Sequence, residues 1–385
     1  MHIPSLIIAG DLCLQGRPSN LSSSQLLPLL DDIKPILLSA DASLVNLETA
    51  VINQNIPAIQ KAGPIIGSDK RVLDLICKSG FTGVTLANNH FADYGPEGVE
   101  ESLQLLDEYN LWYVGAGMNV EMAAQTKYLQ VGDKKVAIIN ACEHEFTIAR
   151  NNKPGCNALN PIRQYAAIQE ARAKANNVIV IIHGGVEYYS LPTPRMQETY
   201  RFFIDAGADA VVNHHQHCYS GSELYKGKPI VYGLGNFFFD WQGQEDSWYE
   251  GYMVNLQFGQ GIDIELIPYI QNHESLGIKL MQGEQKDMFN QKISELNKTI
   301  QDSALLHHEL QKWAAGKKEE YIQMLETLKG KNVKRLERLH LIAPSQYHNW
   351  NPEYFTAERC LLFKSLFQCE SHQEIMNILF NTDKQ

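Results

Sequence analysis

Residues 84–90 read VTLANNH, and this stretch decides the fold. Its first four residues are apolar or β-branched, as in a buried strand. The next three, Asn88, Asn89 and His90, are polar and can bind a metal or a substrate. In α/β proteins, ligands bind where strands of this kind end. The stretch therefore indicates a strand that leads into a functional site.

The same transition occurs at four other places in the first two-thirds of the chain. Four apolar runs end in polar residues: LIIA (6–9) in Gly10-Asp11, LVNL (44–47) in Glu48, VIVII (178–182) in His183, and AVV (210–212) in Asn213-His214-His215-Gln216-His217. Stretches with helical apolar spacing separate these runs. Strands that alternate with helices predict a layered α/β core with a largely parallel centre.

The composition changes after about residue 271, where Gln, Lys, Glu and Leu replace Val, Ile and Gly. Helical apolar spacing continues over residues 288–329, with an interruption expected near Gly316, and again over residues 352–380. We therefore predict a core at residues 1–274 and an α-helical region at residues 275–385. Its apolar residues are expected to pack onto the core or against a second subunit, which would make a homo-oligomer.

Composition and charge restrict the partners. The net charge of −11 argues against nucleic-acid binding, which needs a basic surface. An anionic small molecule or polymer remains a possible substrate, because bound metal ions can reverse the field in one cleft. The seven cysteines are widely spaced without a C-x-x-C pair, which favours reduced thiols. No run approaches the ~20 apolar residues of a membrane helix. The start, MHIPSLIIAGDL, reads as a strand rather than a signal peptide, so we expect a cytoplasmic protein.

The residue types at the five strand ends are chemically compatible with one another. Strand ends in an α/β core converge, so these side chains are expected to lie together. Carboxylates, imidazoles and an Asn carbonyl are ligands that suit Mn, Fe or Zn. A carboxylate can bridge two such ions, and an ion pair can generate hydroxide and hold a phosphoryl group. The sequence thus predicts a hydrolytic centre with two divalent transition-metal ions.

Each of these residues has a plainer explanation when it is considered alone. Gly10-Asp11 and Asn88-Asn89 are common in turns. Glu48 could be a solvated charge at the start of a helix, and His183 a hydrogen-bonded residue after a strand. The spacing of His215 and His217 is harder to dismiss, because His-x-His is a spacing of metal ligands. Because residues of this kind occur at all five strand ends, turns, solvated charges and isolated hydrogen bonds explain the whole set poorly.

In this order, the residues resemble the calcineurin-like binuclear metallophosphatases, which carry an aspartate motif, an acidic bridging motif, an Asn-His motif, a lone His and a final His-x-His. The closer resemblance is to the CapA-type proteins, accessory proteins of capsule and poly-γ-glutamate synthesis and a divergent branch of that superfamily. It covers roughly residues 5–270 and rests on these segments: GD (10–11), GR (16–17), NLE (46–48), LANNH (86–90), DYG (93–95), HGGVEY (183–188), GADAVV (207–212) and GNFFFD (235–240).

The resemblance implies a metallophosphatase-like α/β sandwich and a role for each motif. The implied metal ligands are Asp11, Glu48, Asn89, His183, His215 and His217. Glu48 would bridge the two ions, and His90 would be the general acid or transition-state stabiliser.

The chain departs from the family pattern at three positions. Asn213 and Gln216 stand where relatives usually have Gly and Pro. The Asp-x-His of ordinary metallophosphatases is Asp11-Leu12-Cys13 here, so one ligand is missing or replaced. Cys13 could bind metal, but a small buried thiol is the simpler interpretation.

A further set of residues is expected to contact substrate or to support the ligands: Arg17, Asn88, Glu187, His214 and Asn236. Arg17 could bind a phosphate or carboxylate through two hydrogen bonds, or it could be a surface or helix-capping residue. Glu187 could orient a ligand imidazole. Asn236 could close the pocket, or it could belong to a turn.

Three functions remain open. The leading hypothesis is a phosphoesterase in which hydroxide generated at the metals attacks a phosphoester. The second is hydrolysis of an amide, because the CapA resemblance implies a link to poly-γ-glutamate. The third is a non-catalytic accessory protein whose site binds an anionic polymer or stabilises the fold, and the missing histidine at position 13 favours it.

Overall fold

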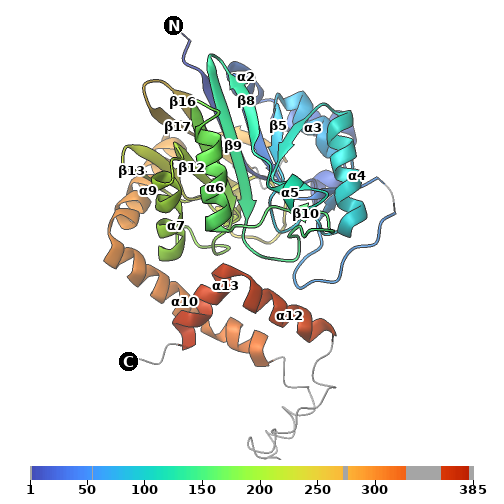
Figure 1. Cartoon of the computed structure of the whole chain (residues 1–385), viewed down its shortest axis with the longest axis vertical. Helices are drawn as coiled ribbons and strands as arrows, with labels where there is room; N and C mark the ends of the chain where they lie inside the picture. Colours follow the sequence, from blue (N-terminus) through green and yellow to red (C-terminus); the bar gives the residue numbers. More distant parts are fainter. Residues whose placement is uncertain (1, 54, 272–275, 327–356, 381–385) are drawn as a thin grey trace, which may run out of the picture. The chain divides into compact units, whose positions relative to one another are not determined.

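The computed structural model describes residues 2–53, 55–271, 276–326 and 357–380. Two large β-sheets and their covering helices form the core of the chain (Figure 1). The layered α/β core that the alternation of strands and helices predicts is therefore confirmed.

The first large sheet has eight strands and a parallel centre. Its order is β18-β17-β16-β1-β2-β5-β6, with β15 beside β1. The parallel strands are β1 (Ser5–Leu12), β2 (Ala42–Leu47), β5 (Gly83–Thr85), β6 (Trp112–Val114) and β15 (Asn236–Phe238). The antiparallel edge consists of β16 (Glu250–Phe258), β17 (Ile262–Gln271) and β18 (Ile278–Leu280).

The second large sheet has six strands in the order β13-β14-β12-β11-β9-β8. Its parallel strands are β9 (Lys134–Cys142), β11 (Asn177–His183), β12 (Ala210–His214) and β14 (Lys228–Val231). Its antiparallel strands are β8 (Lys127–Val131) and β13 (Ser222–Tyr225). Two small sheets pair β3 (Ala50–Val51) with β4 (Gly67–Ser68) and β7 (Ala116–Gly117) with β10 (Gly155–Cys156).

Most helices connect the strands, and the last ones follow the sheets. The helices are η1 (Arg17–Asn20), α1 (Ser23–Leu26), η2 (Leu27–Leu30), α2 (Lys34–Ser39), α3 (Arg71–Ser79), α4 (Gly95–Glu108), α5 (Val120–Ala123), α6 (Pro161–Arg172), α7 (Pro194–Asp205), α8 (Asp246–Tyr249), α9 (Glu284–Gln301), α10 (Ser303–Glu326), α12 (Ala357–Gln368) and α13 (Glu370–Phe380).

The central strands are covered on both sides. Helices α6 and α7 contact β9, β11 and β12, as Figure 1 shows. The two sheets also meet directly: Asn140 of β9 accepts hydrogen bonds from the backbone N–H groups of Leu86 and Ala87, just after β5. His214 of β12 is bonded to the carbonyl of Ala9 in β1, at 3.0 Å. Burial on both faces explains why these strands read as continuous apolar runs.

The interruption predicted near Gly316 is wrong. Gly316 lies inside α10, and the break falls instead at Asp302, between α9 and α10. The carboxylate of Asp302 accepts hydrogen bonds from the backbone N–H groups of Ala304 and Leu305, both at 3.0 Å, and so caps the start of α10. The predicted helical residues 327–329 and 352–356 lie outside the described residues.

The chain divides into two compact units. The first comprises Met1–Ile59 and Ile65–His307, and the second Gln60–Pro64 and His308–Gln385. Helix α9 contacts β13 and belongs to the first unit. In the second unit, α12 contacts α13, and Tyr321 of α10 is hydrogen-bonded to His372 of α13 at 2.9 Å. The division between the two compact units thus falls later in the chain than the predicted domain boundary at residues 274/275. That boundary stays a prediction.

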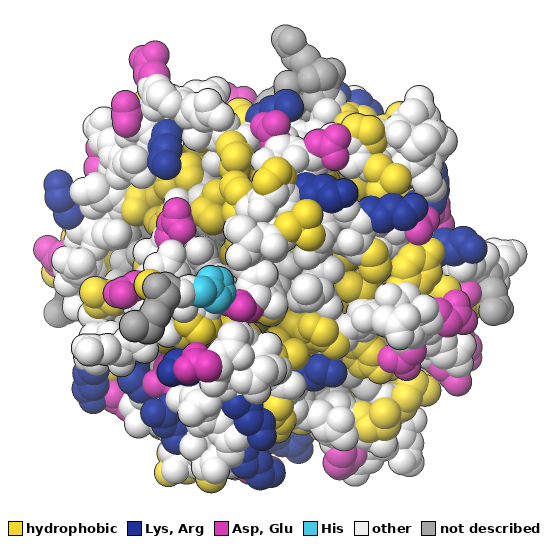
Figure 2. All heavy atoms as spheres, turned by 90° about the horizontal axis from the view of Figure 1, so that it is seen from above, with side chains coloured by type: hydrophobic (Ala, Val, Ile, Leu, Met, Phe, Trp, Pro, Cys, Tyr) yellow, Lys and Arg dark blue, Asp and Glu magenta, His cyan; other side chains and the backbone are white. Residues whose placement is uncertain are grey.

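The surface and the thiols bear on the expected environment. Figure 2 shows a face on which acidic and basic side chains are interspersed with apolar ones, unlike the broad basic surface of nucleic-acid-binding proteins. All seven cysteines lie in the described residues, and none of them forms a disulfide there. Within the described ranges, no helix combines the length and the apolar character that crossing a membrane requires.

Candidate metal centre

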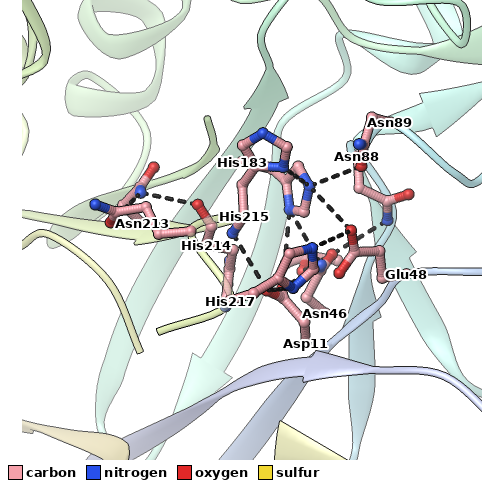
Figure 3. Close-up of polar contacts among 12 residues, drawn as sticks. Asp11, Asn46, Glu48, Asn88, Asn89, His183, Asn213, His214, His215 and His217 are labelled. Carbon is pink, nitrogen blue, oxygen red and sulfur yellow. Dashed lines mark hydrogen bonds and ion pairs between the residues drawn. The ribbon is translucent and has the colours of Figure 1, made fainter. Parts of the chain in front are cut away.

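The predicted ligands lie together at the carboxyl ends of strands from both large sheets (Figure 3). Each is at most 7% exposed. Asp11 lies near the end of β1, and Glu48 directly follows β2. The others come from the segments at the ends of β5, β11 and β12: Asn89, His183, His215 and His217.

Gly10 brings Asp11 into this cluster. The pairing of β1 with β2 is irregular between Ala9 and Asp11, so the strand is locally displaced at Gly10. A Cβ atom at Gly10 would lie 1.9 Å from the carbonyl oxygen of Gly235. Only glycine permits this approach of two backbones, which explains the Gly-Asp pair at the strand end.

His183 stands at the centre of the cluster. Its Nε2 atom lies 3.1 Å from Asn89 Oδ1, 3.1 Å from His215 Nδ1 and 3.4 Å from Glu48 Oε1. Its other ring nitrogen, Nδ1, is 3.2 Å from the side-chain nitrogen of Asn46. The nitrogen directed at the carboxylate and the Asn carbonyl is therefore Nε2, the atom that a shared metal would engage.

His217 is the second imidazole that approaches Glu48. Its Nε2 atom is 3.8 Å from Glu48 Oε1, and its Nδ1 atom is 3.7 Å from Asp11 Oδ2. Nδ1 is also hydrogen-bonded to Asn236 Oδ1 at 2.9 Å. A partner on one ring nitrogen fixes the tautomer and orientation of a ligand imidazole, so Asn236 supports His217 in this way.

Three groups of potential ligand atoms are found among the described residues, and two of these groups share one residue. Glu48, His183 and His215 form one group, and Asp11, Glu48 and His217 form the other, with all atoms of a group within 4.8 Å of one another. A carboxylate common to two groups is what a bridging ligand requires. Carboxylate, imidazole and amide oxygen donors also match the preferences of divalent transition metals. These residues therefore fit two such ions.

The electrostatics of the cluster agree with this fit. Burial raises the pKa of Asp11 to about 6, and the neighbouring charge of Glu48 adds to the rise. Burial also holds the pKa values of His183 and His215 well below their ordinary value, and neutral imidazole is the form that binds metal. Two buried carboxylates side by side are unfavourable without a compensating charge, which cations would supply.

Asn46 and Asn88 hold the ligand loops in place. Asn46 donates a 2.7 Å hydrogen bond to Asp11 Oδ1 and accepts one from Asn88 at 3.2 Å. The side-chain oxygen of Asn88 accepts from the backbone N–H groups of His90, at 3.0 Å, and Phe91, at 2.8 Å. Asn88 therefore shapes the turn that carries Asn89. A role of Asn88 in support of metal ligands stays a prediction. Asn46 is the first residue of the NLE segment (46–48), but the sequence alone suggested no role for it.

His90 forms a pair with a buried acid. Its Nδ1 atom lies 2.7 Å from Asp93 Oδ2, and Asp93 is completely buried. The same oxygen accepts a hydrogen bond from the backbone of Ile66 at 2.9 Å, which fixes the carboxylate. A carboxylate on Nδ1 orients the imidazole and occupies that nitrogen, so acid–base chemistry would fall to Nε2. Asp93 is a member of the DYG segment, but sequence reasoning had not singled it out.

Three residues that the sequence singled out lie outside the groups of potential metal ligands found in the described residues. The guanidinium of Arg17 binds the carboxylate of Asp240 through two hydrogen bonds, Nε to Oδ2 at 2.9 Å and Nη2 to Oδ1 at 2.6 Å. His214 is bonded to the backbone of β1. Cys13 is fully buried in a cluster of large apolar side chains: Ile66, Phe239, Trp248 and Tyr249. It belongs to none of the potential ligand groups found among the described residues.

The two unusual residues of the His cluster stabilise its strained backbone. His215 and His217 have positive φ angles of 92° and 55°, which are unfavourable for residues other than glycine. Between them, Gln216 donates hydrogen bonds to the carbonyls of Tyr189, at 2.6 Å, and Leu191, at 3.1 Å. The departure from the family pattern at position 216 thus has a structural role.

Asn213 occupies a fully buried position just before the two strained residues. Its side-chain nitrogen donates to the carbonyls of Gly184, at 2.9 Å, and Tyr232, at 3.1 Å. Its oxygen accepts the hydroxyl proton of Tyr200 at 2.6 Å. It therefore ties the end of β12 to the loop after β11 and to the residue that follows β14.

We expect Asn213→Leu to lower the free energy of unfolding by about 1–3 kcal/mol, because buried polar groups lose their partner. Chemical denaturation of the metal-free protein would measure this. Tyr200→Phe is the matched control, since it removes only one of these bonds, and about 1 kcal/mol is expected. Equal stability of wild type and Asn213→Leu would contradict the structural role of Asn213.

Comparison with known families matches residues 5–241 to a family described as bacterial capsule synthesis protein PGA_cap. The capsule biosynthesis protein CapA of Bacillus anthracis is 32% identical over 225 residues, which cover 56% of this chain and 55% of that protein. The PGA biosynthesis protein CapA of Bacillus subtilis is 32% identical over 220 residues, 56% of this chain and 58% of that one. The chain thus spans little more than half the length of these curated relatives.

Among solved structures, a putative 5'-nucleotidase from Staphylococcus aureus is similar, with a TM-score of 0.46 and 16% identity. The similarity covers 76% of this chain and 58% of that one.

Proposed function

This chain belongs to the bacterial capsule synthesis protein family PGA_cap, and from this premise we propose that it is a metal-dependent hydrolase, a phosphoesterase that uses two divalent transition-metal ions. The resemblance to CapA-type proteins is thereby confirmed. One observation carries the proposal: Glu48 belongs to two groups of potential metal ligands that have no other residue in common.

The proposal gives each group one ion. Asp11, Glu48 and His217 would hold the first, and Glu48, His183 and His215, together with the carbonyl of Asn89, the second. When bound, such a pair of ions lowers the pKa of water and stabilises negative charge on a phosphoryl group.

The rest of the reaction falls to the side chains of the chain itself. His90 would give a proton from Nε2 to the oxygen of the departing group. Asp93 would hold the imidazole in orientation through the 2.7 Å contact with Nδ1. Asn46 and Asn236 would keep Asp11 and His217 oriented, through hydrogen bonds of 2.7 and 2.9 Å.

A second candidate function is hydrolysis of a γ-glutamyl amide, with poly-γ-glutamate or a capsule polymer as the anionic partner. The relationship to capsule and PGA biosynthesis proteins favours this candidate. A non-catalytic accessory function in polymer synthesis fits the same relationship. Release assays on γ-glutamyl peptides and on phosphoesters, with the same metal-loaded protein, separate the three: cleavage of one substrate class identifies the bond, and cleavage of neither favours the accessory function.

Elemental analysis tests the premise that all of these catalytic candidates share. We expect about two transition-metal ions per chain in the wild type, and their loss in the Asp11→Ala, His183→Ala double variant, which removes one ligand from each group. The matched control is Asp133→Ala, His307→Ala, which changes an exposed Asp and an exposed His outside the groups and should retain both ions. A wild type that stays metal-free after reconstitution with Mn, Fe and Zn would refute the hydrolase proposal and leave the non-catalytic accessory function.

A further inference from the structure

The first metal group has only three members: Asp11, Glu48 and His217. Transition metals in catalytic sites usually take three or more protein ligands plus an exchangeable position. The Asp-x-His of ordinary metallophosphatases would add a histidine at position 13, but the chain has Cys13 there, packed among apolar side chains. The first group therefore has one donor fewer than the second, to which the carbonyl of Asn89 adds a fourth.

Glu187 is the residue in place to do so. A carboxylate oxygen of Glu187 and ring nitrogens of His215 and His217 lie within 4.8 Å of one another, which makes a third potential ligand group. This group shares His217 with the first metal group and His215 with the second. Glu187 is partly exposed, whereas Asp11 and Glu48 are completely buried. Of the three carboxylates in the ligand groups, that of Glu187 is thus the one that solvent reaches.

A backbone contact fixes the loop that carries Glu187 relative to the segment that carries His215 and His217. Glu187 follows Gly184 and Gly185 in the loop after β11, and Gly185 has a positive φ of 107°. The next residue, Tyr188, also has a positive φ, 62°, and its N–H donates a 2.8 Å hydrogen bond to the carbonyl of Gln216. Gln216 lies between the two histidines of the group. The loop that carries Glu187 is thus hydrogen-bonded directly to the segment that carries the two imidazoles.

We propose that Glu187 is a metal ligand, and that it supplies to the His217 side of the site the donor that position 13 lacks. The inference rests on the proposed two-metal function and adds to it a ligand from a different loop. A third carboxylate makes the ligand set harder and more anionic, which favours Mn²⁺ among the candidate ions.

Metal binding by the full-length, metal-free protein tests the proposal without any substrate. Mn²⁺ would be titrated calorimetrically into the wild type and into Glu187→Gln, in which the side chain keeps its shape and hydrogen-bonding oxygen but loses its charge. We expect two equivalents in the wild type. In the variant, one equivalent should bind at least ~100-fold more weakly, because the loss of a residue that only supports a ligand already weakens binding 10- to 100-fold.

Two control variants locate the effect. Cys13→Ala removes the competing donor, and Glu198→Gln changes an exposed glutamate outside the ligand groups. Both should bind two equivalents with wild-type affinity. The Co²⁺-loaded wild type should lack a sulfur-to-cobalt charge-transfer band, because the thiol of Cys13 does not reach the ion. Equal thermal unfolding midpoints of the metal-free proteins would show that all the variants fold.

The outcomes separate this inference from the proposed function. Two equivalents of unchanged affinity in Glu187→Gln would overturn the role of Glu187 and leave the two-metal site intact. Loss of one equivalent in Cys13→Ala, together with a sulfur-to-cobalt band in the wild type, would make Cys13 the ligand instead. A wild type that binds no Mn²⁺ would overturn both proposals.

Discussion

Replacing Glu48 by glutamine is expected to remove both metal ions and to lower the rate of hydrolysis by more than about 10³-fold. Glu48 is the residue that the two metal groups share, and it is completely buried. Its Oε1 atom lies 3.4 Å from His183 Nε2 and 3.8 Å from His217 Nε2. An amide oxygen carries no net charge, so it cannot hold two divalent ions together as a carboxylate does. Elemental analysis and turnover of a chromogenic phosphoester would measure the two effects.

The fold of this variant should survive. The charge of Glu48 raises the pKa of the neighbouring Asp11 in addition to the effect of burial, so removal of that charge relieves a repulsion in the metal-free protein. We therefore expect metal-free Glu48→Gln to be at least as stable as the metal-free wild type. Glu223→Gln is a matched control, since Glu223 is also buried but is paired with Arg201 at 2.6 Å outside the site. It should keep both ions. Retention of two ions in Glu48→Gln would exclude the bridging role.

His90→Ala is expected to lower kcat by about 10²–10⁴-fold while both metal ions stay bound. His90 belongs to none of the potential ligand groups, and its Nδ1 is engaged by Asp93. Its loss should therefore affect proton transfer to the leaving oxygen and leave the metal positions unchanged. Steady-state kinetics and elemental analysis of the same preparation would test this.

Asp93→Asn provides the matched comparison for His90. Asparagine keeps the size of the side chain but replaces the carboxylate that orients His90 through Nδ1, while the imidazole itself remains, so we expect a smaller loss of kcat than in His90→Ala. Activated substrates with good leaving groups should be affected less by both variants, because their departing oxygen needs little protonation. Unchanged turnover in His90→Ala would exclude the acid role, and loss of metal would instead indicate that His90 acts as a ligand.

Local sequence patterns were sufficient to nominate the candidate ligands, because each one lies at or just after an apolar run. Glu48 directly follows β2, and His183 is the last residue of β11. The Gly-Asp pair at the end of β1 was equally visible, although the reason for Gly10 was not. That reason is its close approach to Gly235, which is far away in the sequence.

The supporting residues could not be predicted in the same way. Arg17 looked like an anion-binding residue, yet its partner is Asp240, which lies 223 positions away in the sequence. Asn213 and Gln216 could be noticed as departures from a family pattern, but their hydrogen-bond partners lie in other loops and strands. The identity of a polar side chain gives its capacity for hydrogen bonds and not its partner.

The sequence by itself thus determined the α/β class, the strand ends and the ligand types, because apolar periodicity and the chemistry of side chains are local properties. Only the tertiary structure decided that these strands belong to two sheets, whose carboxyl ends meet so that Glu48 of one sheet faces His183 of the other. It also decided that Cys13 is enclosed by apolar residues while Glu187 approaches the histidines. The physical reason is that packing between sheets and loops depends on contacts between residues far apart in the chain, which no local pattern encodes.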